Sequence, residues 1–186
     1  MDPILTGVGL AGAAGLNAYI PLLALALAGR FGFAQLNAPY DALSSNWGLA
    51  VLLVLLGVEV LADKIPGVDH VNDIINTVIR PAAGAVLMLA SAGAGTLNPG
   101  LAVALGLLCA GGIHGLKASA RPLVTVSTAG IGNPVVSVGE DIAAMALSVL
   151  AFVAPVAVAI LVALLLLALV LFLRALRARR ARRAAA

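Results

Sequence analysis

Residues 59–80 read EVLADKIPGVDHVNDIINTVIR, and the rest of the chain is arranged around this stretch. It holds four of the eight Asp and Glu residues of the chain, although apolar segments flank it on both sides. A charge at membrane depth is costly, so charged residues between apolar spans are functional-site candidates by default. The stretch therefore marks the polar centre of the protein. Its four carboxylates are Glu59, Asp63, Asp69 and Asp73, and the bases among them are Lys64, His70 and Arg80.

The composition is that of an integral membrane protein. Of the 186 residues, 62% are hydrophobic and only 10% are charged, and the mean hydropathy is +1.13. A soluble domain carries roughly 25% charged residues. Several uncharged runs approach the ~20 residues that a helix needs to cross a bilayer. A soluble fold and a nucleic-acid partner are therefore not expected.

The apolar segments predict an all-α fold with about six transmembrane helices. The first span is residues 4–29, where Asn17 and Pro21 predict either a kink or a broken helix that offers backbone groups and an amide to a ligand. The uncharged run 142–173 would be about 48 Å long at ~1.5 Å per residue, which is too long for one crossing, so we divide it at Pro155. The remaining spans are residues 48–62, residues 81–96, and a segment that begins at about Leu101.

The distribution of basic residues predicts that both termini lie in the cytoplasm. With six spans, ten of the eleven Lys and Arg residues face the cytoplasm and only Arg30 faces outward, whereas five spans leave seven inside. An excess of basic residues on the cytoplasmic side is the usual pattern. Residues 1–176 then form one transmembrane domain, and residues 177–186 form a basic cytoplasmic tail. That tail suits anionic lipids, although orienting the chain in the membrane also explains it.

A weak internal similarity relates two glycine-rich stretches. Residues 9–17 and residues 106–114 are identical at four of nine positions, at a constant offset of 97 residues. If residues 4–97 and 100–176 are two repeats of three spans each, they have opposite orientations, as in inverted-repeat transporters. Asn17 and His114 would then lie at equivalent depths near the midplane.

Residues 68–80 have the periodicity of an amphipathic helix that begins after a break at Pro66-Gly67. Asp69 and Asp73 lie one turn apart on its polar side. One interpretation is a helix at the membrane surface with a solvated polar face. Another is a weak divalent-metal site, because Asp69, His70 and Asp73 supply oxygen and nitrogen donors. The apolar positions follow the i, i+3, i+4, i+7 pattern at Val71, Ile74, Ile75 and Val78.

A second polar segment follows the fourth span. Lys117 and Arg121 are one helical turn apart, with a break expected at Arg121-Pro122, and Glu140 and Asp141 return to the same membrane face. Basic side chains that reach toward the interface and acids at a helix start explain these residues equally well. The functional interpretation is a pocket whose bases bind an anionic group. Irregular backbone at membrane depth has to be buried, so we predict that Asp63 or Asp69 meets Lys117 or Arg121 across a shared cytoplasm-facing cavity.

Several motifs are spread over most of residues 5–155. They are residues 15–23 (GLNAYIPLL), 62–69 (ADKIPGVD) with Asp73, 80–84 (RPAAG), and 111–117 (GGIHGLK) with Arg121, Asn133-Pro134 and Glu140-Asp141. With these motifs the chain resembles a bacterial membrane family catalogued as domain of unknown function 4126. The resemblance implies a bacterial inner-membrane protein and supplies no substrate, so the function has to be argued from the residues.

Three functions remain open. The leading hypothesis is a small transporter or channel-like protein for a charged or zwitterionic molecule, an ion or a lipid headgroup. The first alternative is a membrane enzyme that acts on a lipid or isoprenoid through a metal at Asp63 and Asp69, and the second is a structural or partner-binding protein. We favour a non-enzymatic role and a homo-oligomer, and the sequence names no cofactor. The candidate binding residues are Asn17, Glu59, Asp63, Lys64, Asp69, His70, Asp73, Arg80, His114, Lys117, Arg121, Asn133, Glu140 and Asp141.

Overall fold

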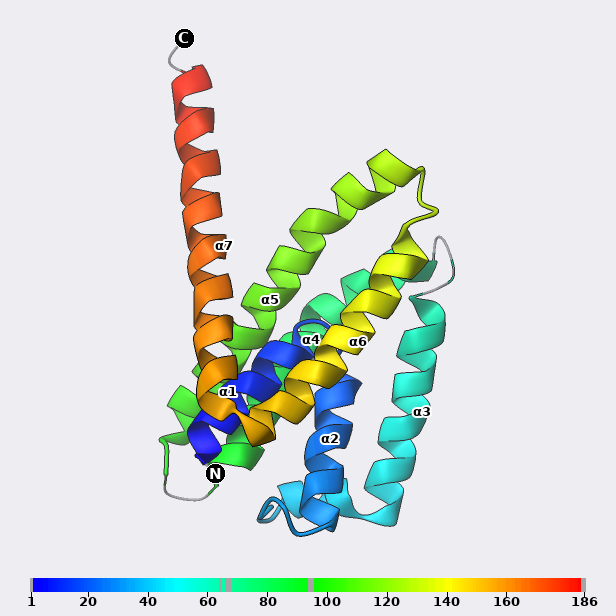
Figure 1. The fold of residues 1–186 in the computed structure, drawn as a ribbon, viewed down its shortest axis with the longest axis vertical. Coiled ribbons are helices and arrows are strands. Elements are labelled where there is room, and N and C mark those ends of the chain that lie inside the picture. Colours follow the sequence, from blue (N-terminus) through cyan, green and yellow to red (C-terminus); the bar gives the residue numbers. More distant parts are fainter. Residues whose placement is uncertain (1, 64, 66–67, 94–95, 185–186) are drawn as a thin grey trace.

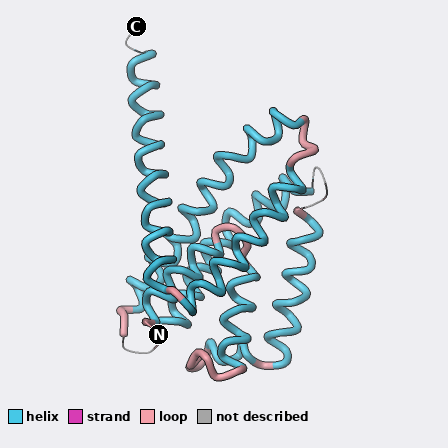
Figure 2. The backbone as a smooth tube through the Cα atoms, viewed as in Figure 1, coloured by secondary structure: helices cyan, strands magenta, loops and turns pink. Residues whose placement is uncertain are grey.

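The computed structural model describes residues 2–63, 65, 68–93 and 96–184, and every regular element in these ranges is a helix (Figure 1). Loops lie at the helix ends, and one short loop lies inside the bundle (Figure 2). The predicted all-α architecture is therefore confirmed. The elements are α1 (Pro3–Ala14), α2 (Tyr19–Arg30), the 3-10 helix η1 (Tyr40–Ser44), α3 (Asn46–Ala62), α4 (Val68–Ala92), α5 (Pro99–Thr128), α6 (Asn133–Val153) and α7 (Pro155–Ala184).

Within the described residues, four helices are long and apolar enough to cross a membrane. They are residues 74–92 of α4, the whole of α5, the whole of α6, and residues 155–178 of α7. The apolar helices α1, α2 and α3 are shorter, at 12, 12 and 17 residues. Leucine, valine and isoleucine side chains cover the outer surfaces of α6 and α7, as a lipid environment requires. These features support a membrane protein, but they do not confirm the count of six spans.

The first predicted span is a broken helix. Helix α1 ends at Ala14 and α2 begins at Tyr19. The side-chain oxygen of Asn17 accepts hydrogen bonds from the backbone N–H groups of Tyr19 and Ile20, at 3.0 and 3.1 Å. Pro21 has no N–H to donate to the residue 17 carbonyl, so a continuous helix would lose a bond where the break occurs. Of the two readings that the sequence allowed, the broken helix is the one observed.

After the break the chain turns back toward the end from which it came. The start of α1, at Pro3 and Thr6, lines the same cavity as Leu25 of α2 and Phe33 just beyond it. We call α1 and α2 together the α1–α2 hairpin. The N-terminus therefore lies at the lower end of the molecule in Figure 1, and the C-terminus lies at the upper end.

The orientation of α1 bears on the predicted repeat. A methyl group added at Gly7 would meet Met88 near the end of α4, and one added at Gly15 would meet Ile113 in the middle of α5. Helices α1 and α5 thus run in the same direction from the end of the bundle where α4 stops. Residues 9–17 and 106–114 are parallel, whereas an inverted pair would be antiparallel, so the inverted repeat is not confirmed.

Three prolines differ in their effect on the helices that contain or follow them. Pro155 starts α7 directly after α6 ends at Val153, as the division of the long apolar run predicted. Pro81 lies inside α4, so the amphipathic segment and the span that follows it form one continuous helix. Pro122 does not break the chain, because α5 continues through it to Thr128, so the expected break at Arg121-Pro122 is wrong. A helix tolerates an internal proline when neighbouring groups satisfy the freed backbone.

The backbones of helices α4 and α5 come close together where the two helices cross. At their crossing, a methyl group on Gly84 would meet the Gly106 carbonyl, and one on Gly106 would meet the Gly84 carbonyl. Small residues let membrane helices approach in this way. The contact holds the polar residues of α4 against those of α5.

Candidate functional site

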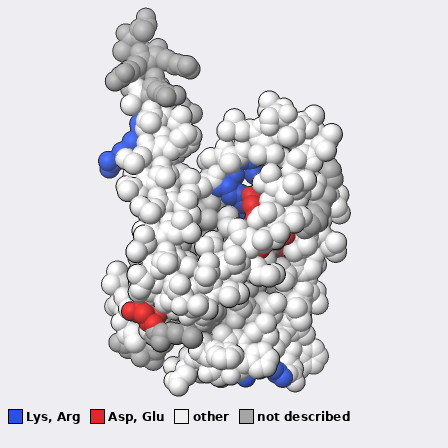
Figure 3. Space-filling model, viewed as in Figure 1, with Lys and Arg blue, Asp and Glu red and all other residues white. Residues whose placement is uncertain are grey.

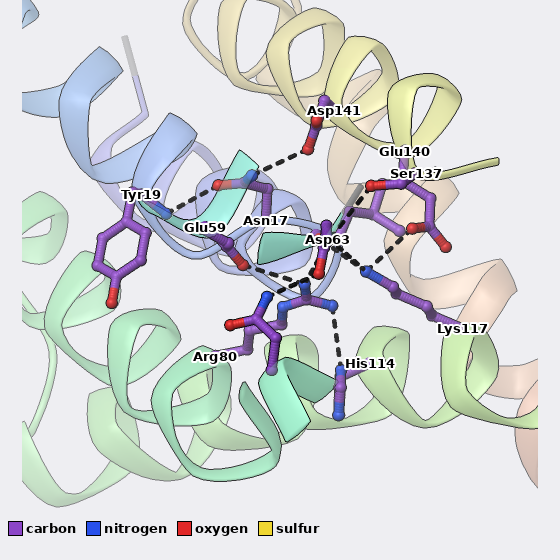
Figure 4. A network of polar contacts seen from close by, with 12 residues as sticks. Asn17, Tyr19, Glu59, Asp63, Arg80, His114, Lys117, Ser137, Glu140 and Asp141 are labelled. Atoms are coloured by element: carbon purple, nitrogen blue, oxygen red, sulfur yellow. Dashed lines mark hydrogen bonds and ion pairs between the residues drawn. The ribbon is translucent and has the colours of Figure 1, made fainter. Parts of the chain in front are cut away.

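Buried and partly buried charged residues from the ends and interiors of four helices converge between the helices (Figure 4). We call these residues the polar network. It lies beside the break in the α1–α2 hairpin, and it unites the two polar segments that the sequence singled out. Its charged members are Glu59 of α3, Asp63 directly after α3, Arg80 of α4, Lys117 and Arg121 of α5, and Glu140 and Asp141 of α6.

Arg80 forms the most deeply buried pair of the network. Its Nη2 lies 3.0 Å from Oε1 of Glu59, and the two side chains are 0% and 2% exposed. Its Nη1 lies 3.3 Å from Nδ1 of His114, whose Nε2 lies 3.2 Å from the Thr77 hydroxyl. Arg80 is thereby held from two sides, and His114 belongs to the network through Arg80.

Asp63 is the centre of the network. Its Oδ2 lies 3.8 Å from a side-chain nitrogen of each of the three cations Arg80, Lys117 and Arg121. Ser137 donates to the same oxygen at 3.2 Å, and the Asn72 amide donates to Oδ1 at 2.6 Å. The predicted meeting of Asp63 with Lys117 or Arg121 is therefore confirmed, and the cytoplasm-facing cavity expected around it stays a prediction.

Glu140 joins the two cations of α5. Lys117 Nζ lies 2.9 Å and Arg121 Nη2 lies 3.0 Å from the same oxygen, Oε2. Lys117 and Arg121 are four residues apart on one helix, so both side chains reach one carboxylate. Glu140 is the most exposed acid of these pairs, at 14%. Basic and acidic atoms are visible in a hollow between α5 and α6 (Figure 3).

The break in the hairpin supplies two further polar groups. The Asn17 amide donates to Asp141 Oδ1 at 2.9 Å while its oxygen holds the start of α2. Lys117 donates to the Leu16 backbone carbonyl at 3.4 Å. A discontinuous helix therefore contributes both a side-chain amide and a free carbonyl to the network.

In the amphipathic part of α4, two polar side chains are buried and apolar side chains are exposed, which is the reverse of a helix on the surface of a soluble protein. Its apolar residues Ile74 and Val78 are each 72% exposed, whereas Asn76 and Arg80 are 1% and 0% exposed. The polar stripe formed by Asn76 and Arg80 thus points into the protein, and Ile74 and Val78 point outward. For these two polar residues the arrangement departs from the interpretation of a helix with a solvated polar face.

Some hydrogen-bonding groups of the buried network have no hydrogen-bond partner within the described residues. They are Oε2 of Glu59, Nε of Arg80 and both polar atoms of the Asn76 side chain. A buried polar group without a partner is costly. These atoms leave capacity for a ligand or water next to the ion pairs.

Sequence reasoning missed several uncharged members. Ser137, Asn72 and the Leu16 carbonyl all contact charged residues of the network. Asn76 carried a usable signal, because it lies one turn before Arg80 on the same face of α4. Ser137 also lies one turn before Asp141, but serine alone gives no indication of burial.

Other predicted residues lie elsewhere or outside the description. Asn133 accepts a hydrogen bond from Thr125 near the α5–α6 turn. Lys64, and the side chains of Asp69, His70 and Asp73, lie outside the described residues, so the metal site suggested for the last three stays a prediction. The described side chains include no group of three His, Cys, Asp or Glu residues that could hold a metal ion.

Comparison with known proteins gives one match. A family model described as Domain of unknown function (DUF4126) matches residues 4–175. No curated protein and no solved structure matches the chain.

Proposed function

The chain belongs to the DUF4126 family, and we propose that it is a membrane transporter for a small charged or zwitterionic solute. The observation that carries the proposal is the position of Asp63. Its carboxylate lies 3.8 Å from each of three cations and is buried between helices apolar enough to cross a membrane. Intramembrane charges that face the bundle interior commonly mark a substrate or ion pathway.

The network is better suited to exchange of partners than to stability. A buried ion pair adds little net stability compared with apolar residues of the same size, because desolvation offsets the attraction. Asp63 makes three contacts of 3.8 Å, whereas the pairs of Glu140 are at 2.9 and 3.0 Å. A zwitterion fits this arrangement, with its anionic group at the bases of α5 and its cationic group at Asp63.

The α1–α2 hairpin supports the same proposal. Transporters commonly bind substrate where a helix is interrupted, because the interruption frees backbone groups at membrane depth. Here the interruption brings Asn17 and the Leu16 carbonyl to Asp141 and Lys117. A movement of the hairpin would therefore alter the network directly.

Uptake into liposomes tests the proposal. Purified protein in phosphatidylcholine liposomes is given a ¹⁴C-labelled amino acid mixture, ³²P-labelled phosphate or ⁸⁶Rb⁺. We expect at least one probe to enter faster than into protein-free liposomes, and Asp63→Asn to slow that entry at least about tenfold. The control is Asp41→Asn, because Asp41 bonds only a neighbouring backbone N–H within the described contacts.

Two results count against transport. One is an uptake indistinguishable from that of protein-free liposomes for every probe, with protein that elutes as a single folded species. The other is unchanged uptake by Asp63→Asn. Should Asp63→Asn fail to fold, Ser137→Ala replaces it, because it removes only the hydrogen bond at 3.2 Å and should raise the KM of uptake.

We further propose that α3 to α7 cross the bacterial inner membrane and that the α1–α2 hairpin enters and leaves on one side. The arginine-rich tail favours a cytoplasmic C-terminus. Arg30 is the last residue of α2 and lies at the open end of the hairpin, which in this arrangement faces outward. The termini lie at opposite ends in Figure 1, so we now favour an outward N-terminus over the expectation that both termini are cytoplasmic. Cysteines at Asp2 and Ala186, in a Cys109→Ala background, should react with a membrane-impermeant maleimide from opposite sides. Reaction from one side would restore the original expectation.

A homo-oligomer also remains our proposal, with anionic lipids at the tail. Its support is the breadth of the outward apolar surfaces on α3, α6 and α7. Native mass spectrometry in mild detergent should show more than one chain per particle. Particles that contain a single chain at every detergent concentration would count against it.

A further inference from the structure

A cavity of about 590 Å³ lies at the end of the bundle where the chain begins. The start of α1, the segment after α2, and the end of α4 line it. It is separate from the polar network, since its lining includes none of the residues that form the network's ion pairs. It faces the side that we propose to be outside the cell.

The lining is polar but uncharged. Thr6, Gln35, Asn37 and Ser91 contribute hydroxyl and amide groups, and Phe33 and Phe152 contribute aromatic surface. No described lining residue is Asp, Glu, Lys, Arg or His. An ion in this cavity would therefore find no countercharge among the described lining residues, and a charge that leaves water without one is unfavourable.

Two hydroxyl groups in this lining are buried and unused. Thr6 Oγ1 and Ser91 Oγ have no hydrogen-bond partner among the described residues, and Thr6 is only 5% exposed. They come from different helices, α1 and α4, and Gly7 of α1 lies against Ser91. Buried hydroxyls are normally hydrogen-bonded, so two unused ones in one cavity point to a missing partner.

We propose that this cavity binds an uncharged amphiphile. A hydroxyl or carbonyl group of the ligand bonds the Thr6 and Ser91 hydroxyls, and its apolar body packs against Phe33 and Phe152. The volume lies within the range of roughly 300–1,000 Å³ that is typical of small-molecule sites. The proposal does not depend on transport, because it uses none of the charged residues.

Binding of monoolein tests this site. Monoolein is uncharged and carries two hydroxyls, an ester carbonyl and one acyl chain. The full chain in maltoside detergent is titrated with monoolein, with oleate at pH 9, and with glycerol, and binding is followed by native mass spectrometry and by the rise in unfolding temperature. We expect one monoolein per chain, and binding at least about tenfold weaker for oleate, which is charged, and for glycerol, which has no apolar body.

Conservative variants locate the bound molecule. Thr6→Val and Ser91→Ala should each raise the Kd for monoolein about fivefold, the effect of one hydrogen bond. Ser127→Ala is the matched control, because Ser127 is exposed and bonds only Val124 within its own helix. Failure of monoolein to bind, equal binding of oleate or glycerol, or unchanged Kd values in both variants would each overturn the proposal. A lack of solute uptake, by contrast, would leave it standing.

Discussion

Helices α4 and α7 differ in how their apolar residues are distributed around the helix. In α4 the apolar residues Ile74 and Val78 face outward, whereas the polar stripe formed by Asn76 and Arg80 is buried. In α7 apolar residues cover all sides, and the buried side chains Val158 and Val162 lie near its start. Periodicity thus locates a stripe on a helix but does not say which side faces inward. In a bilayer the polar stripe has to turn inward, because lipid offers it no hydrogen bonds.

The largest expected effect removes the charge of Arg80 from the polar stripe of α4. Arg80→Leu leaves Glu59 buried without its partner and should lower the free energy of unfolding by about 3–5 kcal/mol. Unfolding by SDS in mixed micelles measures this change. Arg174→Leu on α7 is the control, since Arg174 is exposed and should change stability by less than about 0.5 kcal/mol.

A double variant checks that the loss of stability in Arg80→Leu comes from the Glu59 carboxylate that is left without its partner. Glu59→Leu combined with Arg80→Leu replaces the ion pair by apolar residues, which is often neutral or stabilising. It should regain at least half of the lost stability. A loss below about 1 kcal/mol for Arg80→Leu alone would mean that water reaches the pair and that the stripe is not sealed from solvent.

The second prediction compares one leucine from each helix. Leu87 of α4 is fully buried, whereas Leu164 of α7 is 58% exposed. Leu87→Ala should cost about 3 kcal/mol by creating a cavity, and Leu164→Ala should cost less than about 0.5 kcal/mol. The same SDS titration measures both. A large effect at Leu164 would show that α7 packs against another copy of the chain, and the contrast between the helices would then hold only for the monomer.

The sequence predicted the parts of the structure that have a chemical signature. Asn17 and Pro21 predicted the break, because one supplies a side-chain acceptor and the other lacks a donor. Pro155 predicted the division between α6 and α7. Asp63, Lys117 and Arg121 were expected to meet because lone charges at membrane depth are costly, and they do meet.

The sequence could not predict in which direction the chain continues after the break between α1 and α2. Residues 4–29 are long enough to cross a bilayer, and nothing in the break says whether the chain continues or turns back. The return shows in the cavity that Thr6 and Leu25 share, and the contacts of Gly7 and Gly15 show the parallel course of α1 and α5. Pro122 misled for a different reason: proline favours a break but does not require one, and α5 continues through it.

The third prediction concerns the contact that holds the α4 stripe in place. Gly84→Ala places a methyl group against the Gly106 backbone and should destabilise by about 2 kcal/mol. Gly57→Ala on α3 is the control, because nothing described lies within 4 Å of the added methyl group and alanine favours a helix. The two glycines should therefore shift the SDS midpoint in opposite directions. Equal shifts would place the α4–α5 crossing elsewhere.

The smallest expected effect on stability comes from comparing two asparagines that cap helix starts, one that contacts the polar network and one that does not. Asn17 and Asn98 each accept two backbone N–H groups, at the starts of α2 and α5, but only Asn17 also donates to an acid of the network, Asp141. Asn98→Ala should cost about 1 kcal/mol, the usual value of a helix cap, and Asn17→Ala about 1 kcal/mol more, since it also removes the bond to Asp141. Asp141→Ala removes that bond from the other side. In the Asp141→Ala background, Asn17→Ala should lower the free energy of unfolding only by the value of the helix cap. The loss in the double variant should therefore be about 1 kcal/mol smaller than the sum of the losses in the two single variants. Full additivity would mean that the hairpin merely lies beside the polar network, and movement of the hairpin would then have no direct route to the charges.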